Sequence, residues 1–385
     1  MLKHPELIKI VDSKDISEIN ETLDQLLYVP NELLKPRIIE ELVKYYIGKF
    51  SEDDYKIKFF IAYDENKDPC GFISCEINPN YRSRNRRCAT FGWLHTDNFD
   101  VCKGLITACE NFVRKNNVRL IRGNVNFPKS IGGIGIQVMG FEEQMLYSVP
   151  FGEPFPKILG YLERLGYNKD AEYICMEVTK ERWDQGKRVD KSIRLGYLTL
   201  KELHERKEEL INVAKEAFYA VVPDACTGRV NEILEIYDQV PESHYKLKKE
   251  IDPLTYFGQP EYKEVWESYD LEKVVVWAPM AFDRKTGEIV GTILAVHDLY
   301  ELWLGQPITR ANVDTAMIKS EYKGRGIFSA LNNLGQLCGN LIGVNYYEGT
   351  GIWLINQDAI DAVMPHCQTN RKFVVFQKRL KKSKA

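Results

Sequence analysis

A strand, a turn with two glycines and a helix are predicted in succession within residues 312–333. Residues 313–318 are mostly apolar and predict the strand, and the turn reads Lys-Gly-Arg-Gly-Ile at residues 323–327. Apolar side chains then recur at helical spacing: Phe328, Leu331 and Leu334. Glycine lets the backbone approach a ligand because it has no Cβ. The first turn of a helix offers unpaired N–H groups at the positive end of the helix dipole, so this segment predicts a phosphate or pyrophosphate site.

The spacing of the glycines excludes two common phosphate-binding loops. A Walker loop needs four residues between its glycines and then Gly-Lys-Ser/Thr, and the segment lacks this spacing. A dinucleotide fingerprint needs a third glycine at the position that Ser329 occupies. A strand-to-helix turn that binds nothing remains as the structural alternative.

The segment resembles motif A of the GNAT acyltransferase superfamily, a strand followed by Gln/Arg-x-x-Gly-x-Gly/Ala and a helix. In that superfamily the motif holds the pyrophosphate of acyl-coenzyme A. Here Gly326 matches outright and Lys323 keeps the positive charge, whereas Phe328 replaces the final small residue. Residues 319–322, Lys-Ser-Glu-Tyr, are similar to the usual Val-x-Pro-Glu-Tyr lead-in without its proline.

Length and composition indicate a soluble globular protein with two domains. The chain has 385 residues, 44% of them hydrophobic and 28% charged. A net charge of −3 speaks against nucleic acid as the partner. The absence of a long apolar run and of a signal-peptide core predicts a cytoplasmic protein that does not enter a membrane. Nine scattered cysteines without a Cys-x-x-Cys pair indicate reduced thiols.

The order of the predicted elements suits an α/β fold with a mixed sheet. In the first half we expect strands at residues 6–11, 58–63, 70–77, 88–95, 119–123 and 172–178. Helices are expected after Asp15, after Pro36, after Asp97 or Asn98, and at residues 155–165. The second half begins with a strand at residues 198–200 and helices near 203–218 and 230–240.

A hairpin repeated in the two halves indicates duplicated domains. The pattern at residues 59–73 recurs at residues 279–293, and both halves end in a short helix and a strand, at residues 172–178 and 373–380. Residues 180–191 are almost entirely charged and polar. We therefore place an N-terminal domain at residues 1–180, a linker at 181–194 and a C-terminal domain at 195–385. With its motif, the chain resembles a tandem-GNAT protein of mixed α/β (α+β) class, each domain a mostly antiparallel twisted mixed sheet flanked by helices.

The N-terminal copy resembles a GNAT-like subgroup with a Gly-Pro-x-Asn-Phe segment and a Leu-Glu-x-x-Gly-Phe/Tyr helix end. The matching stretches are residues 91–93, 122–127, 135, 140–141 and 160–167. Asn124 stands where the subgroup has proline, and no glycine pair follows the strand at residues 91–98. The resemblance therefore implies a copy that is degenerate for coenzyme A binding.

Other patterns give weaker indications. Glycines at residues 131–135 invite a phosphate site, but no convincing helix follows, which favours a mobile loop. A run of arginines at residues 82–87 favours a solvated hairpin tip, because no aromatic residues alternate with the charges. Six scattered histidines show no metal-ligand spacing, and no Gly-x-Ser-x-Gly is present.

The resemblance implies direct attack of an amine on the thioester of acyl-coenzyme A. The amine must lose a proton, because only about one alkylamine in a few thousand is unprotonated at pH 7. Two carboxylates on adjacent strands, Asp314 and Glu348, are candidates for the base, and Tyr346 or Tyr347 for protonating the thiolate. Alternation along a strand lets only one of the two tyrosines face the site. A surface carboxylate or a core aromatic residue is the ordinary alternative for each.

The cofactor contacts follow from the same resemblance. Backbone N–H groups near residues 317–319 would hold the oxyanion, and that strand would pair with the pantetheine arm. The implied coenzyme A residues are Met317, Ile318, Lys319, Lys323, Gly324, Arg325, Gly326, Ile327, Phe328 and Asn356. Asn356 could equally cap a helix that starts at Gln357.

The resemblance implies an acyl-coenzyme A-dependent N-acyltransferase, with acetyl-CoA as donor and a small-molecule or peptide amine as acceptor. The N-terminal domain would shape the acceptor site or a homodimer. The acceptor pocket is expected at residues 216–263, which include Tyr237, Tyr245, Tyr256 and Tyr262. One rival is a catalytically inactive binding or scaffold protein, which Phe328 favours. Another is an aminoacyl-tRNA-dependent transferase, which the near-neutral charge disfavours.

Overall fold

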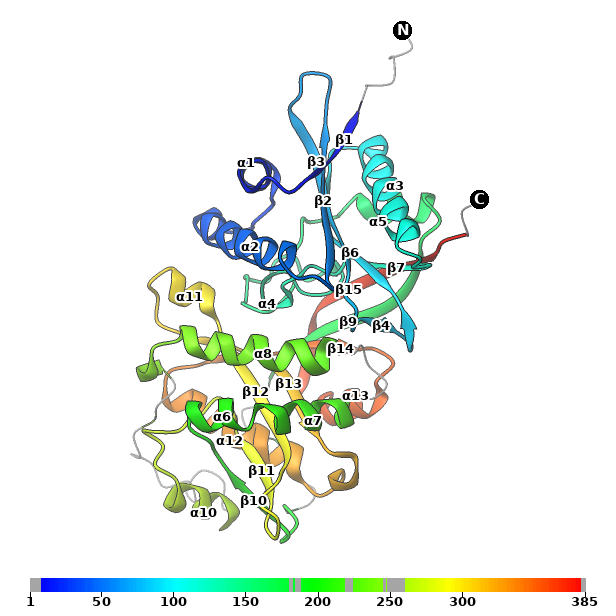
Figure 1. Cartoon of the computed structure of the whole chain (residues 1–385). Coiled ribbons are helices and arrows are strands. Elements are labelled where there is room, and N and C mark those ends of the chain that lie inside the picture. Colours follow the sequence, from blue (N-terminus) through cyan, green and yellow to red (C-terminus); the bar gives the residue numbers. More distant parts are fainter. Residues whose placement is uncertain are drawn as a thin grey trace. The chain divides into compact units, whose positions relative to one another are not determined.

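The computed structural model describes residues 8–179, 183, 188–218, 224–244, 247 and 260–381 (Figure 1). The chain forms two compact units. The first unit contains residues 1–175, 351–357 and 369–385, and the second contains residues 176–350 and 358–368. The sequence predicted two consecutive domains, whereas each of the two units contains more than one segment of the chain. Two late segments belong to the first unit. Residues of β15 (Cys367–Arg379) pair with strands formed early in the chain, and the Leu354 N–H donates to the carbonyl of Glu172 at 3.0 Å.

The sheet of the first unit has the strand order β1-β2-β3-β6-β7-β15. The strands are β1 (Lys9–Ser13), β2 (Lys56–Tyr63), β3 (Pro69–Ile77), β6 (Ala89–Thr96) and β7 (Leu120–Gly123), followed by β15. All neighbours are antiparallel except β6 and β7, which are parallel. β8 (Ile136–Met139) also pairs with β15. β4 (Arg82–Ser83) and β5 (Arg86–Arg87) form a separate hairpin whose exposed arginines confirm the predicted tip.

Helices cover both faces of this sheet. α1 (Ile16–Leu26) and α2 (Lys35–Phe50) lie on one face and α3 (Phe99–Lys115) on the other (Figure 1). The predicted caps Asp15 and Asn98 both accept hydrogen bonds from the first turns of α1 and α3. The core lies between α3 and the sheet and includes Ile73, Phe91, Val101, Leu105 and Ile121. The unit also contains η1 (Glu32–Leu34), α4 (Lys129–Gly132) and α5 (Ile158–Arg164).

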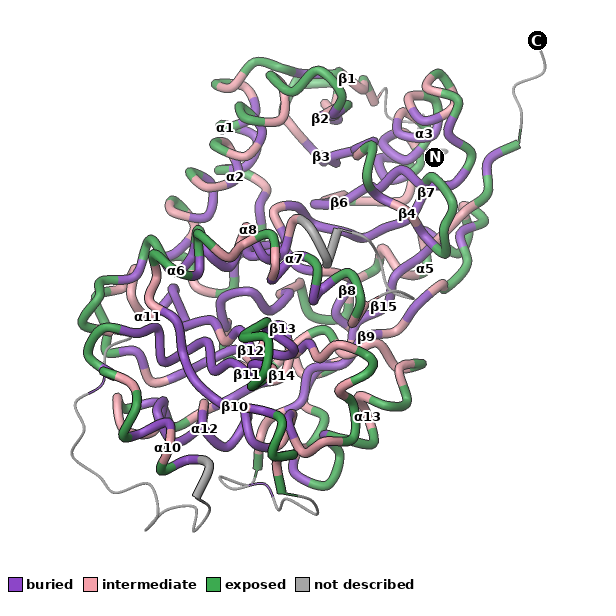
Figure 2. The backbone as a smooth tube through the Cα atoms, turned by 60° about the horizontal axis from the view of Figure 1, so that its bottom comes forward, coloured by how far each residue is buried: buried purple, intermediate pink, exposed green. Residues whose placement is uncertain are grey.

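The second unit repeats this plan with the strand order β10-β11-β12-β13-β14. The strands are β10 (Ile193–Gly196), β11 (Met280–Asp283), β12 (Ile289–His297), β13 (Arg310–Ile318) and β14 (Tyr346–Trp353). Again the pairs are antiparallel up to the last, β13 with β14, which is parallel. The hairpins β2–β3 and β11–β12 confirm the repeat seen in the sequence. Figure 2 shows that β11 and β12 are mostly buried and that β13 is buried in part.

The helices of the second unit also cover both faces of its sheet. α7 (Lys207–Ala217) and α8 (Asp224–Gln239) contact one face, and α12 (Ile327–Leu341) contacts the other (Figure 1). The remaining helices are α6 (Leu200–Glu205), η2 (Glu242–His244), α10 (Pro260–Ser268), α11 (Leu299–Trp303), η3 (Ser320–Tyr322) and α13 (Gln357–Val363). β9 (Asn168–Val178) has residues in both units, as do β14 and β15.

Two local predictions were wrong. The strand expected at residues 198–200 is absent. Thr199 is instead the N-cap of α6, and it forms a reciprocal capping box with Glu202. The glycine-rich loop at residues 131–135 does not protrude as a mobile loop. Its first two residues form the end of α4, and both Ile131 and Gly132 are buried. Within the described part of the chain, no helix combines the length and apolar character needed to cross a membrane.

Candidate functional site

The strand, glycine turn and helix predicted from the sequence are present as β13, residues 319–326 and α12. Gly324 and Gly326 have φ values of 73° and 77°, a region that side chains disfavour. Gly326 is the N-cap of α12 and provides no side chain to bond the first turn. No side chain therefore caps the N–H groups at this helix start, an arrangement that suits an anion.

The charges around this helix start favour an anion. The first turn of α12 contains no acidic residue. The Lys323 ammonium lies 3.6 Å from the Asp358 carboxylate, but both side chains are largely exposed and such pairs are weak. The Arg325 guanidinium lies 4.6 Å from the centre of the Tyr322 ring and donates a 3.0 Å hydrogen bond to the carbonyl of Glu321. Lys319 is half-buried at the end of β13.

β13 and β14 pair over a short distance only. Their parallel register runs from Arg310 opposite Tyr346 to Val313 opposite Gly349. The register between β12 and β13 shifts between Leu294 and Ala295, which leaves Asp314 as a bulge. Among the described residues, 315–318 pair on one side alone, with β12. This free strand edge, which includes buried Met317 and half-buried Ile318, leads from the bulge toward the glycine turn.

The bulged Asp314 is held by a buried arginine. Arg229 of α8 donates two hydrogen bonds to this carboxylate, one of them 2.6 Å long, and Thr315 Oγ1 donates another at 2.6 Å. The side chains of Arg229 and Asp314 are only 7% and 8% exposed. Arg229 also donates to Glu232 at 2.9 Å. Because the carboxylate oxygens are occupied by the guanidinium, the geometry favours a positioning role for Asp314 over that of a general base.

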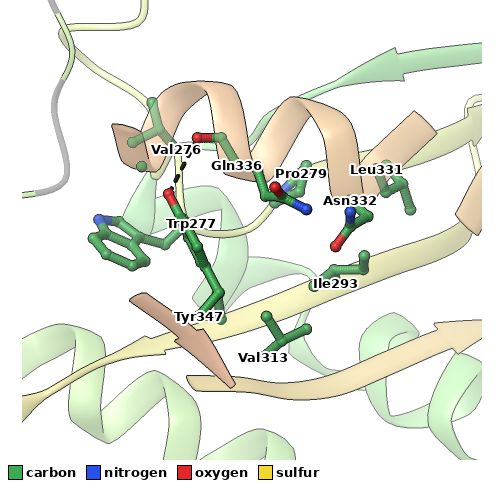
Figure 3. A pocket seen from close by; sticks show the side chains of 12 residues that line it. Val276, Trp277, Pro279, Ile293, Val313, Leu331, Asn332, Gln336 and Tyr347 are labelled. Carbon is green, nitrogen blue, oxygen red and sulfur yellow. Dashed lines mark hydrogen bonds between the residues drawn. The ribbon is translucent and has the colours of Figure 1, made fainter. Parts of the chain in front are cut away.

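The two tyrosines of β14 face opposite sides of the sheet, as alternation predicts. The Tyr346 hydroxyl donates a 2.8 Å hydrogen bond to the fully buried Glu348. The Tyr347 hydroxyl lies under α12, where it donates to the carbonyl of Gln336 at 3.1 Å (Figure 3) and accepts from the side-chain amide of Asn340 at 2.7 Å. Glu348 and Tyr346 thus form one polar group, and Tyr347 belongs to the face covered by α12.

Phe328, which replaces a small residue of the motif, has an aromatic partner. Its ring centre lies 5.4 Å from that of Trp183, which stacks on His366 at 4.6 Å. Asn333 fixes Trp183 by accepting its backbone N–H at 2.8 Å and donating to its carbonyl at 3.0 Å. The neighbouring Ile327 is buried. The large side chain at position 328 is therefore accommodated by contacts that the motif alone could not indicate.

Asn356 is the one predicted cofactor residue that lies outside the second unit. Residues 351–357 belong to the first unit, whereas the glycine turn, β13 and α12 all belong to the second. The Asn356 N–H donates to the carbonyl of Trp353 at 2.9 Å, and α13 begins at the next residue. Of the four tyrosines expected in the acceptor segment, Tyr245 and Tyr256 lie outside the described residues. Tyr237 is buried and donates to the carbonyl of Ala295, at the bulge, at 2.8 Å, and Tyr262 is also buried.

The matching region of the first unit is filled by its own chain. The parallel register of β6 and β7 ends with Phe91 opposite Gly123. Beyond it, Val125 N–H donates to the Phe91 carbonyl at 2.9 Å and Trp93 N–H to the Asn126 side chain at 2.7 Å. A Cβ added to Gly92 would lie 2.0 Å from the Val125 carbonyl oxygen. Residues 125–126 thus occupy the strand edge that stays free in the second unit.

The helix start of the first unit is also occupied. The Asn98 side chain accepts hydrogen bonds from the N–H groups of Asp100 at 2.9 Å and Val101 at 3.0 Å. Asp100 places a carboxylate in the first turn of α3. These side chains take the donors and the favourable potential that an anion would need.

The structure adds features that sequence reasoning missed. One is Arg229, whose partner Asp314 is distant in the sequence. The other is a small cavity under α12 whose wall includes Asn332 and Gln336 (Figure 3). The spacing of these two amides, one helical turn apart among apolar residues, is the signal that could have revealed it.

Comparison with known proteins supports the fold. The sequence significantly matches no protein-family model and no curated protein. The structure is similar to a tandem GNAT protein from the clavulanic acid biosynthesis pathway, with 13% identity, a TM-score of 0.53 and coverage of 97% of this chain and 98% of that one. It is also similar to a GCN5-related N-acetyltransferase from Sphaerobacter thermophilus, with 10% identity, a TM-score of 0.52 and coverage of 97% and 95%.

A third similar structure contains a glucosamine N-acetyltransferase region of a fungal multi-domain β-N-acetylglucosaminidase. The identity is 14% and the TM-score 0.54, and the match covers 97% of this chain and 38% of that one. At these identities the matches establish the fold, and they agree with the mixed sheets, the parallel strand pairs and the glycine turn described above. This chain has the fold of the GNAT N-acetyltransferases.

Proposed function

We propose that this protein transfers an acyl group, acetyl in the simplest case, from acyl-coenzyme A to an amine. The observation that carries the proposal is the uncapped start of α12 after two glycines with positive φ. This helix start would hold the pyrophosphate together with Lys323 and Arg325, and the free edge at residues 315–318 would pair with the pantetheine arm. The similar N-acetyltransferase structures support this choice of reaction.

The residues of the second unit supply the groups that the transfer needs. Acyl-coenzyme A supplies an activated thioester. The backbone N–H groups near the bulge would stabilise the oxyanion. Glu348, held by Tyr346, would accept the proton that the amine loses as the C–N bond forms. Tyr346, which faces the same side of the sheet as Glu348, would protonate the thiolate as the C–S bond breaks. Asp314 and Arg229 would fix the bulge that aims these groups.

We further propose that the first unit does not bind coenzyme A. The strand edge beside β6 is taken by Val125 and Asn126, and the start of α3 is capped by Asn98 with Asp100 nearby. Both features that would bind the cofactor in the second unit are thus replaced by contacts within the first unit.

Calorimetric titration of acetyl-CoA and free coenzyme A tests the proposal. We expect micromolar binding to the wild type and a loss of at least about tenfold in Gly326→Asp, because like charges about 4 Å apart repel by roughly 1–4 kcal/mol. Gly305→Asp is the matched control. Gly305 also has positive φ, 68°, and nothing lies within 4 Å of an added Cβ. It precedes the opposite end of β13.

Binding that survives in Gly305→Asp and is lost in Gly326→Asp supports the proposed site, and a screen of amine acceptors would follow. Absence of binding to the wild type contradicts the proposal. The inactive scaffold would then be the better description, and protein partners would be sought instead.

A further inference from the structure

A small cavity lies between α12 and the strands β12, β13 and β14 (Figure 3). Its apolar wall includes Ile293, Ala295 and Val313 from the strands and Leu331 from the helix. Asn332 and Gln336 of α12 add two carboxamides. The free space admits about one or two water-sized groups. The cavity is therefore small, mostly apolar and polar on one side.

The nitrogens of the two carboxamides lack hydrogen-bond partners within the described structure. Asn332 and Gln336 are 5% and 3% exposed, and their side-chain nitrogens are buried without a hydrogen bond. Leaving buried N–H donors unpaired costs free energy, and leucine or methionine would fill the same positions on this helix without that cost. Figure 3 shows both amides under α12, beside Ile293. Two such donors next to one cavity indicate a ligand that carries a hydrogen-bond acceptor.

The cavity lies at the distance from the start of α12 that the acyl group of a bound acyl-coenzyme A would reach. This step rests on the proposed function. From Gly326 to Gln336 the helix rises about 15 Å at its usual rise per residue. The arm of coenzyme A has about 13 bonds from phosphorus to sulfur and spans roughly 15 Å at the reach of an extended peptide. Along β13, the distance from Ile318 back to Val313 is about 16 Å, close to the reach of that arm. An arm anchored at the start of α12 therefore ends beside Val313, which lines the cavity.

We infer that this cavity receives the acyl group and that the preferred acyl group is short and ends in a neutral oxygen acceptor, a hydroxyl or a carbonyl. The amides of Asn332 and Gln336 would donate to that oxygen. No lysine, arginine or histidine is among the described residues that line the cavity, so a terminal carboxylate would be buried there without a compensating charge. The limited space excludes long chains.

The test compares two donors that differ in one group. Glycolyl-CoA and propionyl-CoA have the same chain length and end in a hydroxyl and a methyl group. Calorimetric titration should give wild type a preference of about tenfold or more for the hydroxyl-ended donor. Gln336→Met and Asn332→Leu should each reduce that preference and leave the affinity for free coenzyme A unchanged. Gln25→Met replaces an exposed glutamine of α1 in the first unit and should behave as wild type.

The outcomes separate the two proposals. If free coenzyme A does not bind, both the proposed function and this inference are overturned. If it binds and the two donors bind equally well, or malonyl-CoA binds best, this inference alone is overturned. Thermal unfolding of the ligand-free variants gives a second readout. Gln336→Met should unfold at or above the wild-type temperature, because it removes an unpaired buried donor, and a clear drop would show that the amide has a structural partner instead.

Discussion

The two units have the same order of strands but differ beside the parallel strand pair. The strand edge and the helix start there are occupied in the first unit and open in the second. In both, a parallel pair of strands ends after three or four residue pairs, and a helix follows the first strand of the pair. In the first unit Val125 and Asn126 bond to β6, and Asn98 caps α3. In the second unit the strand edge after the bulge is free and Gly326 leaves α12 uncapped. A few residues thus decide whether the strand edge and the helix start are occupied by the unit's own chain, as in the first unit, or stay open, as in the second.

The largest effect is expected from the ion pair that holds the bulge of the second unit. Arg229→Met would leave the buried Asp314 carboxylate without its guanidinium and should destabilise the protein by about 3–5 kcal/mol. Urea unfolding measures the change. Lys201→Met breaks an exposed pair with Glu205 and should cost less than about 1 kcal/mol. Equal losses in the two variants would show that the bulge does not depend on Arg229.

The closed edge of the first unit can be probed at Gly92. An added Cβ would lie 2.0 Å from the Val125 carbonyl oxygen, so Gly92→Ala should push the two segments apart and cost about 3 kcal/mol. Gly160→Ala in α5 is the control. Its Cβ has open space, and alanine there should stabilise the helix by up to about 1 kcal/mol. A neutral result at Gly92 would mean that residues 125–126 do not pack on β6 in solution.

The stability of the protein should fall at acid pH, and one histidine in each unit, His297 and His95, contributes to this fall. Burial lowers the pKa of His297 to about 3, and burial also lowers the pKa of the more exposed His95. Below the unfolded value of about 6.5 the unfolded chain binds a proton that folded His297 does not, so stability falls as the pH drops from about 6.5 toward 3. The loss attributable to His297 should reach roughly 2 kcal/mol at pH 5.

Urea unfolding of His297→Gln at pH 7 and pH 5 measures this contribution. The variant should lose less stability between the two pH values than the wild type does. His95→Gln should change the pH dependence less, because the side chain of His95 is 29% exposed. A variant at position 297 with the wild-type pH dependence would contradict the expectation.

Ser329→Asp should change stability least among these variants and should clearly weaken the binding of coenzyme A. Ser329→Asp gives α12 the first-turn acid that Asp100 provides in α3. Near a helix N-terminus the carboxylate should stabilise the fold by about 0.5 kcal/mol. The same charge should weaken coenzyme A binding about tenfold by repelling the pyrophosphate. Calorimetry and urea unfolding of one variant would thus move in opposite directions, and parallel changes would place the phosphate elsewhere.

What could be predicted from the sequence was local. The glycine pair and the apolar period of α12 predicted the strand, the turn and the helix start, because each depends on residues within one or two turns. Local evidence was also available but misjudged at Thr199, where Glu202 three residues later completes a helix cap. The ion pair of Arg229 with Asp314 had no local signal, since 85 residues separate them. The placement of Asn356 and β15 in the first unit likewise depends on pairings such as Phe376 with Gly123.

The position of β15 has a consequence for synthesis on the ribosome. Residues 376–379 complete the sheet beside β7, so the first unit waits for more than 200 intervening residues before its edge strand exists. Until then the edge of β7 has one of its two neighbours only. Contacts of such sequence separation slow folding, because the loop between them must close before they gain stability. The unit whose synthesis begins first therefore completes its sheet only near the end of synthesis. A nascent chain stalled before residue 367 should expose a strand edge that chaperones recognise.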